Sequence, residues 1–374
     1  MAAFALVGLD RQIHLAGAGG VRALTMDLGA NPLLWGQHDI QSAAWSWPTW
    51  SPDGARLAAI ELPSGGEDDL AGPARVQILE QDGLRQRVIL EPKGQVPIAL
   101  SWSPDGEQLG VLLQDEETLS LMACPLDGSR PREVESGAPL FFSWVGAHLL
   151  THAGDPPRVV LHGADEDRLV SDRPGEFCVP LEVCGSLFHV QRIGGLSRLM
   201  RTQGGQTEAL QVLQGLTAMV PDGDSLLLST AGGGQGTPYR GVHRMDARSG
   251  LSSQLSDEEC LAFYPVPGRG GVLMVRVDSA RNCLRWELVD SGGERRELAA
   301  FWPSRETLWS LQFFEHFALS NPPVDPRGEK LVYAGYPAGA DPRRAKAEVF
   351  TLDLDQGAPP LPIHTGSFAC FPPG

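Results

Sequence analysis

The sequence predicts an all-β protein folded as an eight-bladed β-propeller, and three observations carry this prediction. The five-residue turn motif tryptophan-serine-proline-aspartate-glycine occurs at residues 50–54 and again at 102–106. A strand-turn-strand unit follows each copy, and such units recur about every 45 residues, a period typical of propeller blades. Finally, the chain ends on a copy of the first unit and begins on the second, so the two ends complete each other.

The motif is a turn because each of its residues favours one part of a tight reversal. Pro52 fixes φ at the first corner, Asp53 can bond to its own backbone, and Gly54 supplies the positive φ that closes the turn. Two strands joined in this way form a hairpin. Weaker copies of the same frame occur at residues 220–223, 325–328 and 370–374.

The repeat predicts one domain, residues 1–374, made of four-stranded antiparallel blades. Seven contiguous blades are expected at residues 45–90, 97–136, 139–172, 177–213, 216–257, 260–301 and 312–366. The closing blade combines residues 367–374 with residues 1–27. Joining the chain ends in one sheet protects the first and last blades from exposing open edges.

At residues 50–54 and 102–106 the repeat resembles the TolB-type, or WD40-like (PD40), β-propeller repeat. The resemblance implies a relation to six-bladed propellers of periplasmic transport machinery. It also implies a relation to the eight-bladed propellers that gate the catalytic domain of prolyl-oligopeptidase-like peptidases. We expect no hydrolase domain, because ring closure uses the C-terminal residues.

Composition limits the classes of partner. The formal net charge of −16 argues against nucleic acid, which needs a concentrated positive surface. No run of 18 apolar residues is present, so no membrane-spanning helix is expected. Arginine greatly outnumbers lysine, and together with abundant alanine, glycine and proline this leads to the hypothesis of a GC-rich bacterial gene.

The N-terminus and the cysteines bear on location. Residues 1–8 lack the basic start of a signal peptide, and we interpret them as a strand. The six cysteines form no C-x-x-C pair, which favours free thiols in a reducing environment. We therefore expect a cytoplasmic protein, unlike the periplasmic TolB group.

Candidate binding residues come from long loops on one predicted face of the ring. The loops between second and third strands and between blades share this face, and binding residues are common on loops held by a rigid frame. The candidates are Trp35, Glu67, Asp68, Asp69, Tyr239, Arg240, Trp309, Tyr336, Arg343 and Arg344.

Several of these loops allow two interpretations. The carboxylates at residues 67–69 either hold a hard cation or form a solvated acidic loop. The glycine-rich segment 231–241 lacks the Gly-Lys-Ser/Thr and helix of a phosphate-binding loop, so we interpret it as a flexible loop that contacts a ligand. The basic residues around 343–346 either meet an acidic partner or pair with residues 67–69.

Two aromatic segments also stand out. Trp50 is expected to pack between blades, while Trp45 or Trp47 can lie at the channel mouth. Residues 302–317 depart from strand alternation, and Ser304 is a suitable N-cap, so a short helix is expected at the mouth of the ring. His316 beside Glu315 is either a proton-transfer pair or, as we prefer, structural.

Two functions remain open. The chain has no G-x-S-x-G, H-E-x-x-H or Walker motif, and no two histidines have metal-ligand spacing. The preferred prediction is a non-catalytic scaffold or regulatory subunit, with no cofactor, that is monomeric within a complex and binds another protein such as a separately encoded peptidase. The alternative is a channel-centred enzyme or binder of a sugar, lactone or peptide, with or without a metal, for which His38, His152 and His189 are candidates.

Overall fold

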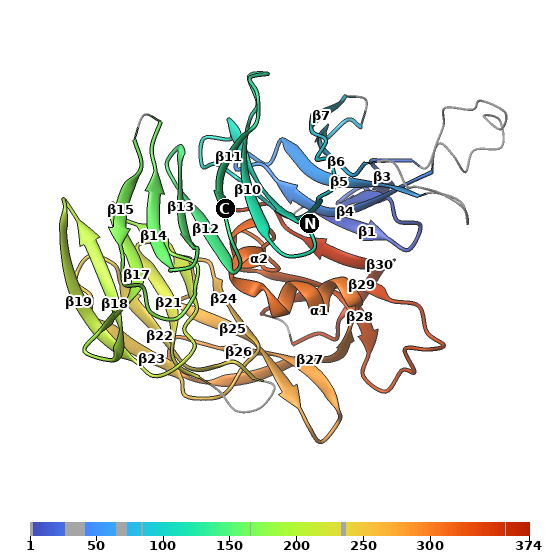
Figure 1. The fold of residues 1–374 in the computed structure, drawn as a ribbon. Coiled ribbons are helices and arrows are strands. Elements are labelled where there is room, and N and C mark those ends of the chain that lie inside the picture. Colours follow the sequence, from blue (N-terminus) through green and yellow to red (C-terminus); the bar gives the residue numbers. More distant parts are fainter. Residues whose placement is uncertain are drawn as a thin grey trace.

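The computed structural model describes residues 3–26, 42–64, 73–83, 85–164, 166–232, 237–355 and 357–374. In this part of the chain nearly every regular element is a strand, and only two helices occur. The strands form antiparallel sheets that surround the helices α1 (Arg305–Gln312) and α2 (Phe314–Ser320), as Figure 1 shows. The arrangement is that of a β-propeller.

Five sheets have four strands each, paired in chain order or its reverse. Two of these sheets contain β4 (Ser42–Trp50), β5 (Arg56–Ser64), β6 (Arg75–Glu80), β7 (Gln86–Leu90), β8 (Val96–Trp102), β9 (Gln108–Gln114), β10 (Leu119–Pro125) and β11 (Arg132–Ser136). The other three contain β12 (Leu140–Val145), β13 (His148–Ala153), β14 (Arg158–His162), β15 (Arg168–Ser171), β16 (Leu181–Val183), β17 (Ser186–Ile193), β18 (Leu196–Gln203), β19 (Gln206–Leu213), β20 (Met219–Asp222), β21 (Ser225–Gly232), β22 (Tyr239–Asp246) and β23 (Ser252–Ser256).

The remaining ten strands are hydrogen-bonded in one continuous sheet. In spatial order they are β24 (Ala262–Val266), β25 (Gly271–Asp278), β26 (Cys283–Val289), β27 (Arg295–Pro303), β28 (Lys330–Pro337), β29 (Glu348–Asp353), β30 (Leu361–Cys370), β1 (Phe4–Gly8), β2 (Ile13–Gly17) and β3 (Gly20–Ala23). β27 and β28 pair only at three residues of each strand, so this join links two separate blades.

The long strand β30 belongs to two blades and closes the ring. Its first half pairs with β29, where Thr365 faces Glu348. Its second half pairs with β1, where Cys370 faces Ala5. β30 therefore lies beside β1 in Figure 1, although the two strands are at opposite ends of the chain. The predicted eight-bladed ring, closed by the C-terminal strand, is confirmed.

The motif tryptophans connect neighbouring blades. The indole N–H of Trp102 donates to the carbonyl of Thr49 at 2.9 Å, and Thr49 belongs to the preceding blade. Trp50 donates in the same way to Cys370 of the closing blade. Because both indoles are buried and hydrogen-bonded to another blade, Trp50 packs between blades as predicted.

The other two tryptophans of this segment are also part of the packing. Trp45 is buried in the hydrophobic core. Trp47 packs its ring against Phe317 of α2 and Phe368 of β30, with centroid distances of 4.7 and 5.1 Å. Both residues therefore support the inner wall of the ring.

The helices form an insertion between β27 and β28 that reaches the centre of the ring. The Ser304 side chain accepts from the backbone N–H of Thr307 at 3.0 Å, which confirms the predicted N-cap. α2 contacts β8, β12 and β20, the first strands of three different sheets. The sequence predicts one short helix at the mouth; the structure has two, and the buried side chains of Phe314 and Phe317 hold the second between the blades. Within the described residues, no helix has the length and apolar character needed to cross a bilayer.

Candidate functional site

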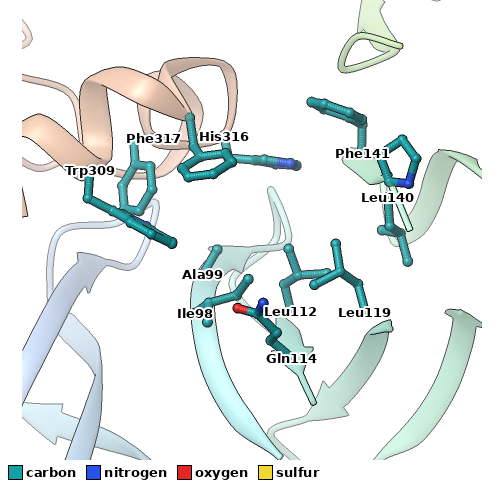
Figure 2. Close-up of a pocket in the computed structure, with 12 residues that line it drawn as sticks. Ile98, Ala99, Leu112, Gln114, Leu119, Leu140, Phe141, Trp309, His316 and Phe317 are labelled. Carbon is teal, nitrogen blue, oxygen red and sulfur yellow. The ribbon is translucent and has the colours of Figure 1, made fainter. Parts of the chain in front are cut away.

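A pocket of about 190 Å³ lies between the helical insertion and the sheets of β8–β11 and β12–β15. Its wall is almost entirely apolar, and Figure 2 shows the helical side chains facing those of the strands. The lining residues are Ile98, Ala99, Leu112, Gln114, Leu119, Pro139, Leu140, Phe141, Trp309, Phe313, His316 and Phe317.

The strand side of the pocket follows from local strand geometry. Leu112 and Gln114 are two residues apart on β9, so they lie on the same face of the sheet. On β8 the register shifts between Pro97 and Ala99, which places Ile98 in a bulge. The bulge lets two consecutive residues, Ile98 and Ala99, both line the pocket.

The helical side contains aromatic residues that remain partly in solvent. Trp309 and Phe313 are one helical turn apart, and their ring centroids lie 4.7 Å from each other. Trp309 is 36% exposed and Phe313 is 45% exposed. Leu308, which precedes Trp309 in α1, is 41% exposed. The pocket therefore opens beside exposed apolar side chains of α1 and its C-cap.

His316 forms the inner wall of the pocket as a neutral ring. It stacks on Phe141 with a centroid distance of 5.4 Å and an interplanar angle of 12°. It also contacts Phe142 at 5.2 Å. Burial lowers the pKa of His316 to about 4, more than the carbonyl of Leu140 offsets. At neutral pH the imidazole is uncharged and acts as an aromatic surface.

Glu315 points to a different part of the ring and is 4% exposed. Burial raises its pKa to about 8, although the backbone N–H groups of Val179 and Met219 partly stabilise the charge. Its Oε1 atom has no hydrogen-bond partner among the described residues. Glu315 and His316 are therefore adjacent in sequence but face different blades, an arrangement that supports the structural interpretation over a proton-transfer pair.

Of the candidate residues, Trp309 lies at the pocket. Tyr239, by contrast, packs its ring on Phe314 and Phe263, with centroid distances of 5.0 and 6.0 Å. Tyr239 thus helps to hold α2 rather than facing solvent as a loop residue. Arg240 is exposed, and its Nε donates to the carbonyl of Asp257 at 2.9 Å.

Three candidates lie far from the pocket, in the blade of β28–β30. Tyr336 is half-buried on β28, opposite Trp302 of β27. Arg343 and Arg344 are exposed in the β28–β29 connection, and Arg344 forms an ion pair with Asp341 at 3.6 Å. None of the three lines the pocket.

The remaining candidates lie outside the described residues. These are Trp35 and the acidic residues Glu67, Asp68 and Asp69. His38 and the glycines at 233 and 234 also lie outside the described residues. The expected pairing of residues 67–69 with the basic residues around 343–346 therefore stays a prediction.

The two other histidines considered for a central site are buried in the sheets. Burial lowers the pKa of both His152 and His189 to about 4, so both are neutral at physiological pH. His152 stacks on Phe177 at a centroid distance of 4.5 Å. Across the described residues, no group of three or more His, Cys, Asp or Glu side chains is placed to hold a metal ion.

Most of the residues that line the pocket were not predicted from the sequence. Ile98, Leu112 and Phe141 are ordinary apolar strand residues in sequence, and nothing in their local pattern separates them from core residues. Phe313 had a weak signal, because it follows Trp309 at helical spacing in the one segment expected to be a helix. The pocket forms only when this segment meets β8, β9 and β12.

Comparison with known proteins shows similarity in fold alone. No protein-family model and no curated protein sequence matches the chain. A solved prolyl endopeptidase aligns with a TM-score of 0.57 and 11% identity, over 89% of this chain and 50% of the endopeptidase. The oligogalacturonate lyase of Vibrio parahaemolyticus aligns with a TM-score of 0.50 and 11% identity, over 97% of this chain and 84% of the lyase. TolB from Acinetobacter baumannii aligns with a TM-score of 0.42 and 14% identity, over 79% of this chain and 63% of TolB.

The coverage differs among these proteins. This chain spans about half of the length of a puromycin-hydrolyzing peptidase of Mycobacterium tuberculosis and of the prolyl endopeptidase, at 48% and 50%. Their sequence identities, 15% and 11%, are too low to transfer an activity. The chain is a β-propeller in its fold.

Proposed function

We propose that the protein is a non-catalytic interaction module that binds another protein through the pocket and the exposed apolar side of α1. The observation that carries this proposal is the solvent exposure of Leu308, Trp309 and Phe313 beside an open apolar pocket. Large apolar side chains grouped on the surface are costly unless a partner covers them. Aromatic anchors of this kind are common in the centres of protein interfaces.

The size of the pocket favours one side chain over a whole small molecule. Its volume is about 190 Å³, close to the engineered cavities of about 150 Å³ that hold benzene. Typical small-ligand sites are larger, at about 300 to 1,000 Å³, and contain several placed polar groups. Here Gln114 and the neutral His316 are the polar side chains of the wall.

The alternative function, a channel-centred enzyme or small-ligand binder, has less support. α2 occupies the space between β8, β12 and β20, where a propeller would otherwise offer an axial channel. Burial raises the pKa of Glu315 to about 8 and lowers that of His152 and His189 to about 4, which favours the neutral form of these three groups at pH 7. A neutral, filled centre is a better support for an interface than for charge-dependent catalysis.

The identity of the protein partner is also part of this proposal. A separately encoded peptidase is one candidate, because the chain matches the fold of half of a prolyl endopeptidase. We also propose a monomeric propeller within a complex, acting in a reducing compartment such as the cytoplasm. All six cysteines are free thiols, and five of them are buried, which agrees with such a compartment.

The test is affinity capture from lysate of the native host, with quantitative mass spectrometry. The bait proteins are the unmodified chain, a Trp309→Ala/Phe313→Ala double variant, and Leu251→Ala as a matched control. Leu251 is 76% exposed on the β22–β23 turn, far from the pocket in the fold. We expect a stoichiometric protein partner that the double variant loses and the control retains.

Two results would overturn this proposal. One is a partner that the double variant retains as well as the unmodified chain does, which would place the interface elsewhere. The other is the lack of any stoichiometric partner together with turnover of a small molecule, which would favour the alternative function. Circular dichroism of each bait confirms that the variants are folded.

A further inference from the structure

The rim of the pocket is acidic on one side. The β9–β10 turn contains Asp115, Glu116 and Glu117, and it lies directly between two lining residues, Gln114 and Leu119. These carboxylates therefore lie at the edge of the pocket that Gln114 and Leu119 form.

The conformation of this turn directs two of the three carboxylates into solvent. The carboxylate of Asp115 accepts from the backbone N–H groups of Glu117 and Thr118, at 3.0 and 2.8 Å. Those two hydrogen bonds lower the pKa of Asp115, so it stays charged. Glu116 and Glu117 are exposed, and neither forms an ion pair with a described residue.

The strand connections at the rim carry little positive charge, and on the helical side the basic residue of α1 is Arg305, one turn before Trp309. Three strand connections flank the pocket: β7–β8, β9–β10 and β11–β12. Lys93 on the first is their single basic residue, and Glu91 lies on the same connection. The C-terminal end of α1, where Phe313 lines the pocket, has no basic residue in its last turn.

We infer that the pocket binds a bulky apolar side chain in a basic segment of a partner protein. Lysine or arginine residues beside the apolar anchor pair with Glu116 and Glu117. The inference rests on the proposed function and specifies the chemistry of the partner: an apolar anchor supplies affinity, and the acidic rim selects for cationic flanks. A second copy of this chain fits poorly, because each copy carries a net charge of −16.

The test uses three synthetic nonapeptides that carry the same fluorophore. The first has a central phenylalanine flanked by two lysines and two arginines. The second has four glutamates in place of the basic residues. The third keeps the basic residues and has alanine at the centre. Dissociation constants are measured by fluorescence anisotropy against the whole chain, at low salt and at physiological salt.

We expect the basic phenylalanine peptide to bind about tenfold or more tightly than either of the others, and to weaken with salt. The Glu116→Lys/Glu117→Lys variant should weaken this peptide about tenfold and remove most of its salt dependence. Glu107→Lys/Glu133→Lys is the control, because both residues are exposed, lie away from the pocket and change the net charge equally. The control variant should bind the peptide within about twofold of the unmodified chain.

The outcomes separate this inference from the proposed function. Equal binding of the basic and acidic phenylalanine peptides, lost in Phe313→Ala, would overturn the charge selection and leave the docking pocket in place. Binding of the basic peptide that Phe313→Ala does not weaken would overturn the pocket as the docking site. Failure of all three peptides to bind, or a dimer in sedimentation equilibrium that Phe313→Ala dissociates, would overturn the inference of a basic partner segment.

Discussion

The two helices of the insertion use aromatic side chains in opposite ways. In α2, Phe314 is 0% exposed and packs against Tyr239 of β22 and against Phe263 and Tyr264 of β24. In α1 and its C-cap, Trp309 and Phe313 leave a third or more of their surface in water. The first arrangement is typical of a core element and the second of an interface. The two helices are nevertheless separated by one residue, Phe313. Hydrophobicity alone therefore does not distinguish structural from binding residues; the fraction left exposed does.

The sharpest test of the difference is the pair Phe314→Ala and Phe313→Ala. Phe314→Ala should lower the free energy of unfolding by about 3 to 5 kcal/mol, because it leaves a cavity among buried aromatic rings. Phe313→Ala removes the same atoms from a half-exposed site and should cost less than about 1 kcal/mol. Urea denaturation measures both values. Equal losses would mean that α1 is as much a part of the core as α2.

Glu315 tests how strongly α2 is held inside the ring. Its folded pKa of about 8 lies above the usual value of 4.5, so the folded state binds an extra proton between these two pH values. Stability should therefore fall as the pH rises through this interval, by about 1.4 kcal/mol per pH unit at most. Nearby Cys178 and Tyr239 add little, because burial raises the pKa of both groups.

The matched variant for this prediction is Glu315→Gln, which keeps the shape of the side chain and removes the titration. The difference in unfolding free energy between Glu315→Gln and the unmodified chain should grow in favour of the variant from pH 5 to pH 8. Because only the difference is used, other titrating groups such as His316 cancel. Parallel pH profiles would show that the carboxyl group is hydrated rather than buried.

A smaller effect is expected at the start of α1. Ser304 caps the first turn by accepting from Thr307, so Ser304→Ala should cost about 1 kcal/mol. Ser304→Thr keeps the hydroxyl and should cost less. If α1 is the interface helix, the loss of its cap should weaken partner binding clearly and lower the melting temperature only slightly. A large drop in melting temperature with unchanged binding would contradict the division of roles between the helices.

The smallest effect on stability is expected for Trp309→Ala. Its indole rests on Phe313 at the surface, so the free energy of unfolding should change by less than about 1 kcal/mol. Capture of the protein partner, in contrast, should drop by tenfold or more, as for an interface anchor. A stability loss as large as that of Phe314→Ala would remove the basis for calling Trp309 a binding residue.

Much of the fold was predictable because its signals are local. Ser51, Asp53 and Gly54 form the turn by themselves: the carboxylate of Asp53 accepts from the Ser51 hydroxyl, and Gly54 has a φ of +67°. The same contacts recur at Ser103 and Asp105, and Gly106 has a φ of +71°. A turn of this kind depends on a few consecutive residues, so the sequence shows it directly.

The N-cap of α1 was predictable for the same reason. The ring closure was predictable because each chain end supplies only part of a blade. Of the six candidate binding residues in the described part of the chain, however, Trp309 alone lines the pocket. Tyr239 was expected in the glycine-rich loop at residues 231–241, but it begins strand β22 and its ring is turned inward onto Phe314. The direction of a side chain at a strand end depends on a register that one residue can reverse.

The sequence by itself determined the repeat, the blade order and the start of the helical insertion, since each of these rests on turn chemistry and alternation within a few residues. Only the tertiary structure decided that α2 fills the centre of the ring, that Glu315 is buried, and that Ile98, Phe141 and Phe313 share one pocket. These features arise where segments more than a hundred residues apart meet. Their geometry is set by the packing of whole blades, and no local pattern encodes it.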